Sequence, residues 1–450
     1  MFQRLIAYWD RTSFYLNRVV YYSGFAAVVL FVLSYFVPVL FHLAVLVLVL
    51  LTMAVLVEAL LLYRKKNGLQ AQRFLNARLS NGDENKVLIE LQNHYEFKAR
   101  CMVIDELPFQ FQERNWRREA VMDPFQKTTI EYFLQPRERG SYHFGNINVY
   151  VQGPLNLVRR RFIFPAEKTV KVYPSYIQMR RFSLMAVANH LQQTGVKRMR
   201  KLGHSMEFEQ IKEYVRGDDY RTINWKATAR HGDLMVNNYT DERSQQVYCL
   251  VNKGRVMKMP FDGMSLLDYA INASLVISNV ALQKQDKAGL ITFSQNLDAF
   301  LPADKKPTQI NLILETLYKQ QTNFLEPDFE KLFSAVRNRI SHRSLLVLFT
   351  NFESIESLKR ELPFLKRLAH YHLLMVVFFE NTELKTLAEA KALTTEDIYI
   401  KTIADKYRHE KKLIARELQA QGIISVLTTP QQLTINTLNK YLELKNRQSI

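Results

Sequence analysis

The chain has 450 residues, 48% of them hydrophobic, with 61 lysines and arginines against 43 aspartates and glutamates. This length exceeds one ordinary domain, and the hydrophobic content excludes wholesale disorder. Cys101 and Cys249 lie far apart in apolar runs, which excludes a disulfide framework and predicts two small buried side chains in a reducing compartment. The net charge of +18 predicts attraction to an anionic partner, either lipid or nucleic acid.

The first 66 residues contain a long stretch without charge. No Lys, Arg, Asp or Glu occurs from Val19 to Val57, which is 39 residues, whereas about 20 suffice for one membrane span. Pro38 lies near the middle and disfavours helical geometry in the residue before it. We therefore predict a membrane anchor, residues 1–66, with two transmembrane helices at Val19–Val37 and Phe41–Leu62, so that residues 19–62 are embedded. A cleaved signal peptide and a buried soluble hairpin are the alternatives, and the length disfavours both.

Cations flank this stretch and are absent from its turn. They are Arg4, Arg11 and Arg18 before it, and Arg64, Lys65 and Lys66 after it. The positive-inside rule then predicts a multi-pass protein of the cytoplasmic membrane, with both termini and the soluble domains in the cytoplasm. Glu58, near the inner end of the second span, is expected to reach the interface or to pair with Arg64.

Residues 67–175 are predicted to form a small antiparallel β-sandwich. Short alternating runs recur there with turn residues between them, namely KVLIELQ, FKARCMVI, TTIEYFLQ, YHFGNINVYV and KTVKVYP. Strands at this spacing are typical of such sandwiches. The region shows no catalytic pattern.

Residues 244–450 alternate between apolar strands and helical patterns. The predicted strands are Val247–Val251, AGLITF, SLLVLFT, HLLMVVFF and IISVL, and amphipathic helices such as SLLDYAINASLVISNVALQ lie between them. This alternation predicts a doubly wound α/β domain with five central parallel strands, covered on both faces.

A basic connector precedes that domain, and residues 176–243 hold most of it. Its cation runs are Arg159–Arg161, Arg180–Arg181 and KRMRK at Lys197–Lys201. Beside a membrane anchor, the simplest partner for these cations is anionic lipid, and a solvated face without a specific partner is an equally good alternative. Nucleic acid is disfavoured as a partner, because no helix-turn-helix, zinc-finger or paired-aromatic signature supports it.

The connector ends in the most specific string of the chain, GHSMEFEQIKEYVRGDDYRTINWKATARHGDLMVNNYTDER, from Gly203 to Arg243. It resembles the signature of a bacterial family called domain of unknown function fifty-eight. The matching residues are Glu207, Phe208, Tyr214, Gly217, Asp218, Arg221, Ile223, Trp225, Ala229 and Arg230. The resemblance covers nearly the whole chain, because family members commonly begin with a two-helix membrane anchor, and DELP, PRERGSYHFG and GPLNLVRR look like the motifs that follow it.

The signature segment also has a physical interpretation of its own. Asp218 is expected to cap a helix, and Gly232 to end it. Arg221 and Arg230 are expected to make forked bonds to nearby carboxylates, and Trp225 to pack against the sheet. The segment is then either a clamp on the α/β domain or a surface that faces a partner.

The resemblance further implies that the α/β domain is similar to the von Willebrand factor type A domain. Many such domains hold Mg²⁺ through Asp-x-Ser-x-Ser after the first strand, a Thr from a second loop and an Asp from a third. The corresponding positions are Asn252, Gly254 and Val256 in the first loop, Thr322 or Pro327 in the second, and Asn351 in the third. Because Mg²⁺ keeps its waters unless carboxylates or phosphates replace them, we expect neither a metal nor any other cofactor at this degenerate site.

Two cations, Lys253 and Arg255, lie in the same first loop. They predict a metal-free surface on which fixed cations meet acidic side chains of a partner, and a plain strand-to-helix turn is the alternative. The candidate partner-binding residues are Asn252, Lys253, Gly254, Arg255, Thr350 and Asn351, flanked by Arg221 and Arg230.

The leading hypothesis is a membrane-anchored cytoplasmic adaptor, not an enzyme, at the bacterial inner membrane. The resemblance implies a MoxR-type AAA+ ATPase as its partner, since the family is commonly encoded beside one. The chain has no phosphate-binding Gly-x-x-x-x-Gly-Lys-Ser/Thr, no His-Glu-x-x-His and no Gly-x-Ser-x-Gly. A hydrolase acting on envelope or protein substrates remains an alternative, because triads assemble from distant residues. An electrostatic nucleic-acid binder is the further alternative.

Overall fold

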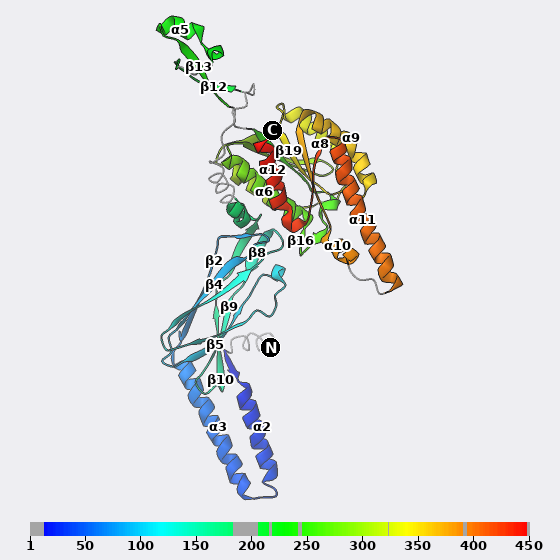
Figure 1. Cartoon of the computed structure of the whole chain (residues 1–450). Coiled ribbons are helices and arrows are strands. Elements are labelled where there is room, and N and C mark those ends of the chain that lie inside the picture. Colours follow the sequence, from blue (N-terminus) through cyan, green and yellow to red (C-terminus); the bar gives the residue numbers. More distant parts are fainter. Residues whose placement is uncertain are drawn as a thin grey trace. The chain divides into compact units, whose positions relative to one another are not determined.

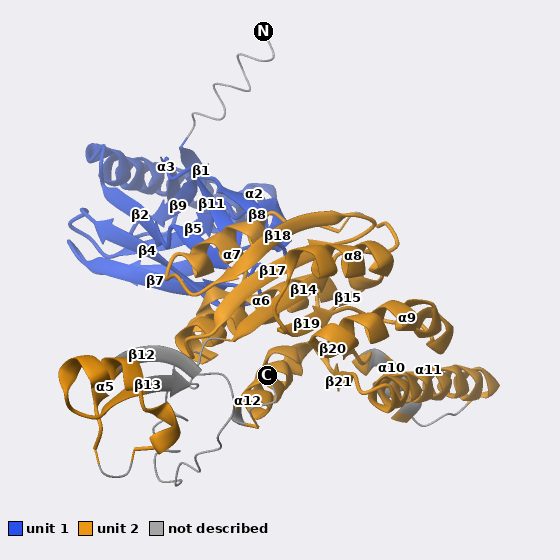
Figure 2. Ribbon diagram, turned by 90° about the horizontal axis from the view of Figure 1, so that it is seen from above, with its two compact units in different colours: residues 1–173 blue, residues 174–450 orange. Residues whose placement is uncertain are grey.

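A computed structural model gives the fold of the chain (Figure 1). It describes residues 13–182, 206–215, 218–241, 245–322, 324–389 and 394–447. The chain divides into two compact units, Met1–Tyr173 and Pro174–Ile450 (Figure 2).

Unit 1 begins with strand β1 (Phe14–Leu16) and two apolar helices, α2 (Arg18–Leu33) and α3 (Val39–Arg64), which lie side by side (Figure 1). In the described part of the chain α3 alone is long and apolar enough to cross a membrane, whereas α2 has only 16 residues. The helix break at Pro38 is confirmed. The first helix ends at Leu33 and not at Val37, because residues 34–38 form the turn that the proline requires.

Three sheets complete unit 1. Their strands are β2 (Leu69–Leu75), β3 (Arg78–Ser80), β4 (Asn85–Asn93), β5 (Ala99–Asp105), β6 (Arg118–Met122), β7 (Lys127–Leu134), β8 (Gly140–Phe144), β9 (Ile147–Gln152), β10 (Val158–Phe164) and β11 (Lys168–Tyr173), with a 3-10 turn η1 (Phe109–Phe111). The sheet orders are β1-β10-β9-β5-β6, β2-β4-β7 and β3-β11-β8, and every pair except β3 with β11 is antiparallel. The predicted antiparallel β region is confirmed in this form.

Alternation along the strands builds the core of unit 1. In β4, Val87, Ile89 and Leu91 are buried while Lys86 and Glu90 are exposed, which is the period of a strand with one face inward. Cys101 is buried in the same core, as predicted for both cysteines.

A buried ion pair crosses this core and explains the DELP motif. Asp105 accepts hydrogen bonds from Arg73 and from the Tyr132 hydroxyl, and all three side chains are buried. The second acidic residue, Glu106, accepts from the backbone N–H of Asn146 at 2.8 Å. Both carboxylates therefore organise the strand ends, since a buried charge is tolerated where it is paired and hydrogen-bonded.

Unit 2 contains a six-stranded sheet with helices on both faces. Its elements are β14 (Gln246–Asn252), α6 (Leu266–Gln283), β17 (Lys287–Phe293), β18 (Leu297–Asp304), α7 (Gln309–Tyr318), α8 (Phe329–Arg339), β19 (Leu345–Phe349), α9 (Ile355–Tyr371), β20 (Leu373–Phe379), α10 (Thr382–Glu389), α11 (Thr395–Ala420), β21 (Ile424–Thr428) and α12 (Leu433–Asn446). Short elements η4 (Arg255–Met257), β15 (Pro260–Phe261), β16 (Met264–Ser265) and η5 (Pro430–Gln432) lie between them.

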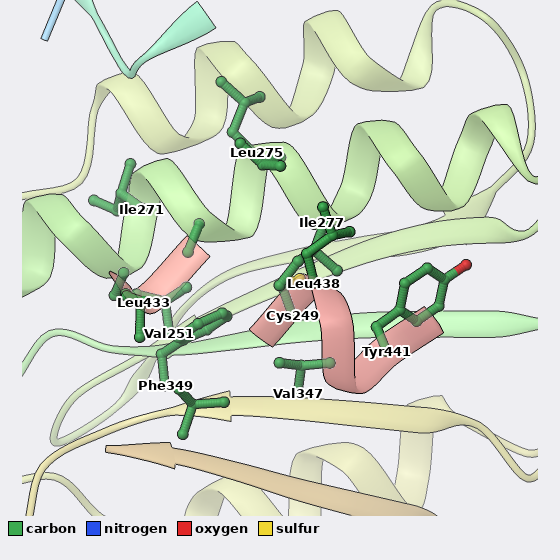
Figure 3. Packing of buried hydrophobic residues seen from close by; sticks show 14 of the residues in the cluster. Cys249, Val251, Ile271, Leu275, Ile277, Val347, Phe349, Leu433, Leu438 and Tyr441 are labelled. Carbon is green, nitrogen blue, oxygen red and sulfur yellow. The ribbon is translucent and has the colours of Figure 1, made fainter. Parts of the chain in front are cut away.

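The sheet order is β18-β17-β14-β19-β20-β21. The five predicted strands are present and parallel, while β18 is an antiparallel edge strand that the sequence did not reveal. Apolar side chains of α6 and α12 pack on one face, where Cys249, Ile277 and Tyr441 meet (Figure 3). Helices α8, α9 and α11 cover the other face. The predicted doubly wound α/β arrangement is therefore confirmed in outline.

Candidate functional site

The carboxyl ends of β14 and β19 meet through one buried amide. Asn252, the last residue of β14, is fully buried, and its Nδ2 donates to the hydroxyl of Thr350 at 2.9 Å. Its Oδ1 accepts from the backbone N–H of Gly254 at 2.8 Å. Asn252 thus uses both ends of its amide to join the first loop to the loop that follows β19.

The segment between α7 and α8 closes on the first loop. Thr322 donates its hydroxyl to the carbonyl of Lys253 at 2.9 Å, and Arg255 donates its backbone N–H to Leu325 at 3.0 Å. A Cβ on Gly254 would lie 2.8 Å from that same Leu325 carbonyl oxygen and 3.1 Å from Cδ of Pro327. Both second-loop positions that the sequence proposed therefore lie against the first loop.

Lys253 is directed into the domain. Its side chain is only 12% exposed, and Nζ lies 3.1 Å from Asp298 Oδ2 and 3.3 Å from Gln320 Oε1. A cation bonded in this way holds β18 and the end of α7 to the first loop. The structure therefore places Lys253 in an internal ion pair and leaves little of it for the surface.

Arg255 is the exposed cation of the first loop. Its side chain is 55% exposed, and one guanidinium nitrogen lies 3.3 Å from Glu326 and 3.6 Å from Glu353. Glu326 comes from the second loop and Glu353 from the third, and both are exposed. The three charges together form a rim, which we call the Arg255 rim, across the carboxyl edge of the sheet.

A third cation reaches the site from α11. Lys411 Nζ donates to Asn351 Oδ1 at 2.7 Å and also to the carbonyl of Phe352. Burial lowers the pKa of this amine to about 8, although Glu353 and Glu410 oppose the shift. Sequence reasoning missed Lys411, because 60 residues separate it from Asn351 and it lies in an ordinary charged helix.

Fixed cations therefore hold together the three loops at the carboxyl edge of the sheet. Lys253, Arg255 and Lys411 each join elements that are distant in sequence. Across the described ranges no three His, Cys, Asp or Glu side chains are grouped so as to hold a metal ion. The exposed charges of the Arg255 rim suit electrostatic recognition of a partner, since they are already held in place by pairing with one another.

The signature segment forms a hairpin of its own. Strands β12 (Met206–Glu213) and β13 (Met235–Asp241) pair, with the turn η3 (Tyr220–Thr222) and the short helix α5 (Trp225–His231) between them (Figure 1). Gly232 ends α5 with a φ of +85°, as predicted. The predicted cap is wrong: Asn224 caps α5, and Asp218 instead accepts from the N–H of Val215 and from Lys212, both at 3.1 Å. The cause is a 3-10 turn at 220–222 that delays the helix.

Trp225 does not pack against the large sheet. Its side chain is 70% exposed on α5, so the expected anchoring role is wrong. Arg221 lies with its guanidinium 5.8 Å from the ring centre of Tyr220, and Arg230 is exposed in the last turn of α5. Tyr214 donates its backbone N–H to Leu234 at 2.7 Å. Two further signature positions, Gly217 and the Glu207 side chain, lie outside the described residues, as do Arg4, Arg11 and Lys197–Lys201.

Glu58 forms a contact that the sequence did not predict. Its carboxylate is fully buried and accepts hydrogen bonds from the backbone N–H groups of Leu155 at 2.9 Å, Leu157 at 2.7 Å and Val158 at 2.9 Å. The expected pairing of Glu58 with Arg64 is therefore wrong. The donors belong to the GPLNLVRR motif, which the sequence had singled out. That motif was the one sequence signal that could have pointed to this contact.

The same motif binds the ends of the apolar helices. Arg160 donates to the carbonyls of Leu62 at 2.6 Å, Lys65 at 2.8 Å and Lys66 at 3.1 Å, which satisfies acceptors that the end of α3 leaves free. Arg159 donates to Asn17, the cap of α2, at 2.5 Å. These arginines lie in β10 and not in a connector, and their guanidinium groups bond within unit 1. Their interpretation as a lipid-facing or solvated run is therefore corrected.

Comparison with known sequences agrees with the signature. The profile of the family described as "Protein of unknown function DUF58" matches residues 210–397, which identifies this region of the chain as that family's domain. A distant relative is the uncharacterized protein YeaD of Bacillus subtilis (strain 168), 27% identical over 202 residues. The match covers 43% of this chain and 50% of YeaD, so the chain spans about half the length of this curated relative.

Two solved structures are similar to separate regions of the chain. The conserved hypothetical protein BatB from Bacteroides thetaiotaomicron is similar over 45% of this chain and 100% of its own, at 12% identity and a TM-score of 0.29. The seventh PapD-like domain of human CEP192 is similar over 24% of this chain and 87% of its own, at 12% identity and a TM-score of 0.18.

Proposed function

We propose that this protein is a membrane-anchored cytoplasmic adaptor whose α/β domain binds another protein at the carboxyl edge of its sheet. The observation that carries the proposal is the Arg255 rim, where three exposed charges lie above loops that Lys253 and Lys411 hold internally. A surface of this kind can recognise complementary charges without a metal. We infer that the domain is of the von Willebrand factor type A kind, with its metal position replaced by built-in cations.

The apolar hairpin supports the anchor. Only 11% of the apolar 18-residue stretch of α3 is buried, whereas a core helix of a soluble protein would be mostly buried. From Val39 to Val57 the helix extends about 28 Å, close to the roughly 30 Å of a bilayer's hydrocarbon core. Exposed aromatic residues, Tyr21 and Tyr22 near one end of α2 and Tyr35 and Phe36 at the turn, match the two interfacial belts of membrane helices.

The partner that the family resemblance suggests is a MoxR-type AAA+ ATPase, and that resemblance is its only support. The rim favours a protein partner with mixed charge, because Arg255 can exchange its two carboxylates for acidic groups of the partner while Glu326 and Glu353 accept cations. Nucleic acid has less support than the composition suggested, since Arg159–Arg161 bond within unit 1.

The test is affinity capture of the full-length protein from detergent-solubilised membranes. Wild type is expected to recover the ATPase, and Arg255→Glu is expected to lose most of it. Lys306→Glu is the matched control, because Lys306 is an exposed cation paired with Asp304 at the opposite edge of the sheet. Capture of no ATPase by wild type, or equal capture by Arg255→Glu, would contradict the proposal.

A further inference from the structure

We propose that the loop Gly153–Leu157, between β9 and β10, lies at the bilayer surface and inserts the Leu155 side chain among the lipids of the cytoplasmic leaflet. Glu58 is the positioning residue that holds the loop there. This inference rests on the membrane anchoring proposed above and adds a second lipid contact, made by the β region itself.

Both apolar helices leave the β region at the level of this loop. Asn17, which caps α2, donates its side-chain amide to the carbonyl of Asn156 at 2.8 Å and its backbone N–H to Leu157 at 2.7 Å. On the other side, α3 passes the loop at Glu58. The loop therefore marks the plane at which α2 begins and the charge-free part of α3 ends.

Apolar surface starts immediately beyond that plane. A groove of about 400 Å³ between α2 and α3 is lined by Leu16, Val20, Leu51, Thr52, Val55 and Leu56. Val55 and Leu56 precede Glu58 by three and two residues, which is only about 3–5 Å along the helix axis. Hydrocarbon in contact with this groove would thus reach to within one helical turn of the loop.

The loop presents apolar side chains at this level. Leu155 is 54% exposed, and Pro154 beside it is also exposed. A loop at the edge of the hydrocarbon needs its backbone groups satisfied within the protein. The Glu58 carboxylate accepts the N–H groups of Leu155, Leu157 and Val158, so these donors need no water.

Gly153 permits the close approach. A Cβ at this position would lie 2.3 Å from Glu58 Oε1 and 2.5 Å from its Cγ, so any larger residue would separate the loop from α3. The carboxylate and the glycine together fix the depth of the loop, and the Leu155 side chain is left exposed for lipid.

The experiment measures membrane depth with nitroxide labels on the full-length protein in phospholipid bilayers. One cysteine is introduced at a time, and its collisions with oxygen, which concentrates in hydrocarbon, are compared with those with a water-soluble nickel chelate. Native Cys101 and Cys249 are buried, and burial raises the pKa of each thiol to about 12, so both stay unlabelled at neutral pH.

Leu155→Cys is compared with Val49→Cys in α3 and with Phe133→Cys, an exposed apolar position on β7 in the β region. We expect the oxygen-to-nickel collision ratio to be highest for the label at position 49. The label at 155 is expected to give a ratio several-fold above that of a label in water, and the label at 133 the ratio of a label in water. A high ratio at 49 with an aqueous ratio at 155 would overturn this inference and leave the anchor intact. An aqueous ratio at 49 would overturn the anchor, and the inference with it.

Glu58→Gln tests the positioning role. The substitution replaces one acceptor oxygen of the carboxylate by an NH₂ group. This new donor then faces the N–H groups of the loop, with which it cannot form a hydrogen bond. We expect the ratio at 155 to fall toward the aqueous value while the ratio at 49 stays unchanged. An unchanged ratio at 155 would remove Glu58 from the proposal.

Discussion

Three backbone N–H groups surround the carboxylate of Glu58 in the position where a cation was expected. Glu58→Ala would leave these buried donors without an acceptor, and each unsatisfied group costs roughly 1–3 kcal/mol. We expect the free energy of unfolding of unit 1 to fall by about 2–4 kcal/mol, allowing for partial relaxation. Denaturation of the full-length protein in detergent measures the loss. Glu90→Ala, at an exposed position of β4, is the control, and an equally small effect at both positions would contradict the prediction.

Lys411 predicts a pH dependence. Its folded pKa is about 8, whereas its unfolded pKa is near 10.5, so between these values the unfolded chain binds a proton that the folded chain does not. The contribution of Lys411 to stability therefore rises as the pH rises from about 8 to 10.5. The neutral amine still donates to Asn351 and Phe352, which fits this sign. We expect wild type to gain stability relative to Lys411→Met over this window. Parallel stability curves for the two proteins would refute the prediction.

At the scale of elements, the first loop depends on the absence of a side chain at one position. Gly254→Ala would place a Cβ 2.8 Å from the Leu325 carbonyl oxygen, a backbone atom that cannot rotate away. We expect a loss of about 1–3 kcal/mol, the usual cost of overpacking, seen as a lower Tm of the full-length protein. Gly24→Ala in α2 meets nothing within 4 Å and serves as the control. An unchanged Tm in Gly254→Ala would show that the second loop does not close on the first.

The elements that the sequence revealed are those whose burial is uniform. Strand β14 and its parallel neighbours are buried on both faces, so their apolar runs are continuous and were predicted. Strand β10 carries three consecutive arginines, and its alternation is therefore hidden. Arg159 and Arg160 bond to helix ends, and Arg161 bonds to Asn148 in β9. Strand β18 is a half-exposed edge with two register shifts, which removes the period of two. The sequence proposed Asn252 and Asn351 as candidate positions, but the long-range contacts beside them, to Asp298 and Lys411, leave no local pattern.

For the whole molecule, the proposed topology places the turn between α2 and α3 outside the cell and both units inside. Tyr35→Cys is therefore expected to react with a membrane-impermeant maleimide applied to intact cells. Trp225→Cys, which is also exposed on the protein, is expected to react only after the cells are opened. Labelling of Trp225→Cys in intact cells would contradict the proposed orientation. The charge-free length and Pro38 predicted the hairpin, whereas the attachment of its ends to β10 required the three-dimensional structure.

The contact at Glu58 also sets an order of events during synthesis. Its three partner N–H groups belong to residues 97 to 100 positions further along the chain. At about 5–20 residues per second, a ribosome needs roughly 5–20 seconds to make that stretch. We therefore expect α3 to leave the ribosome with an uncompensated carboxylate near its end, and the new hairpin to be free to tilt and rotate. Completion of the loop after β9 is expected to end that freedom, so on the proposed topology the anchor acquires a fixed orientation once residues 153–158 have emerged.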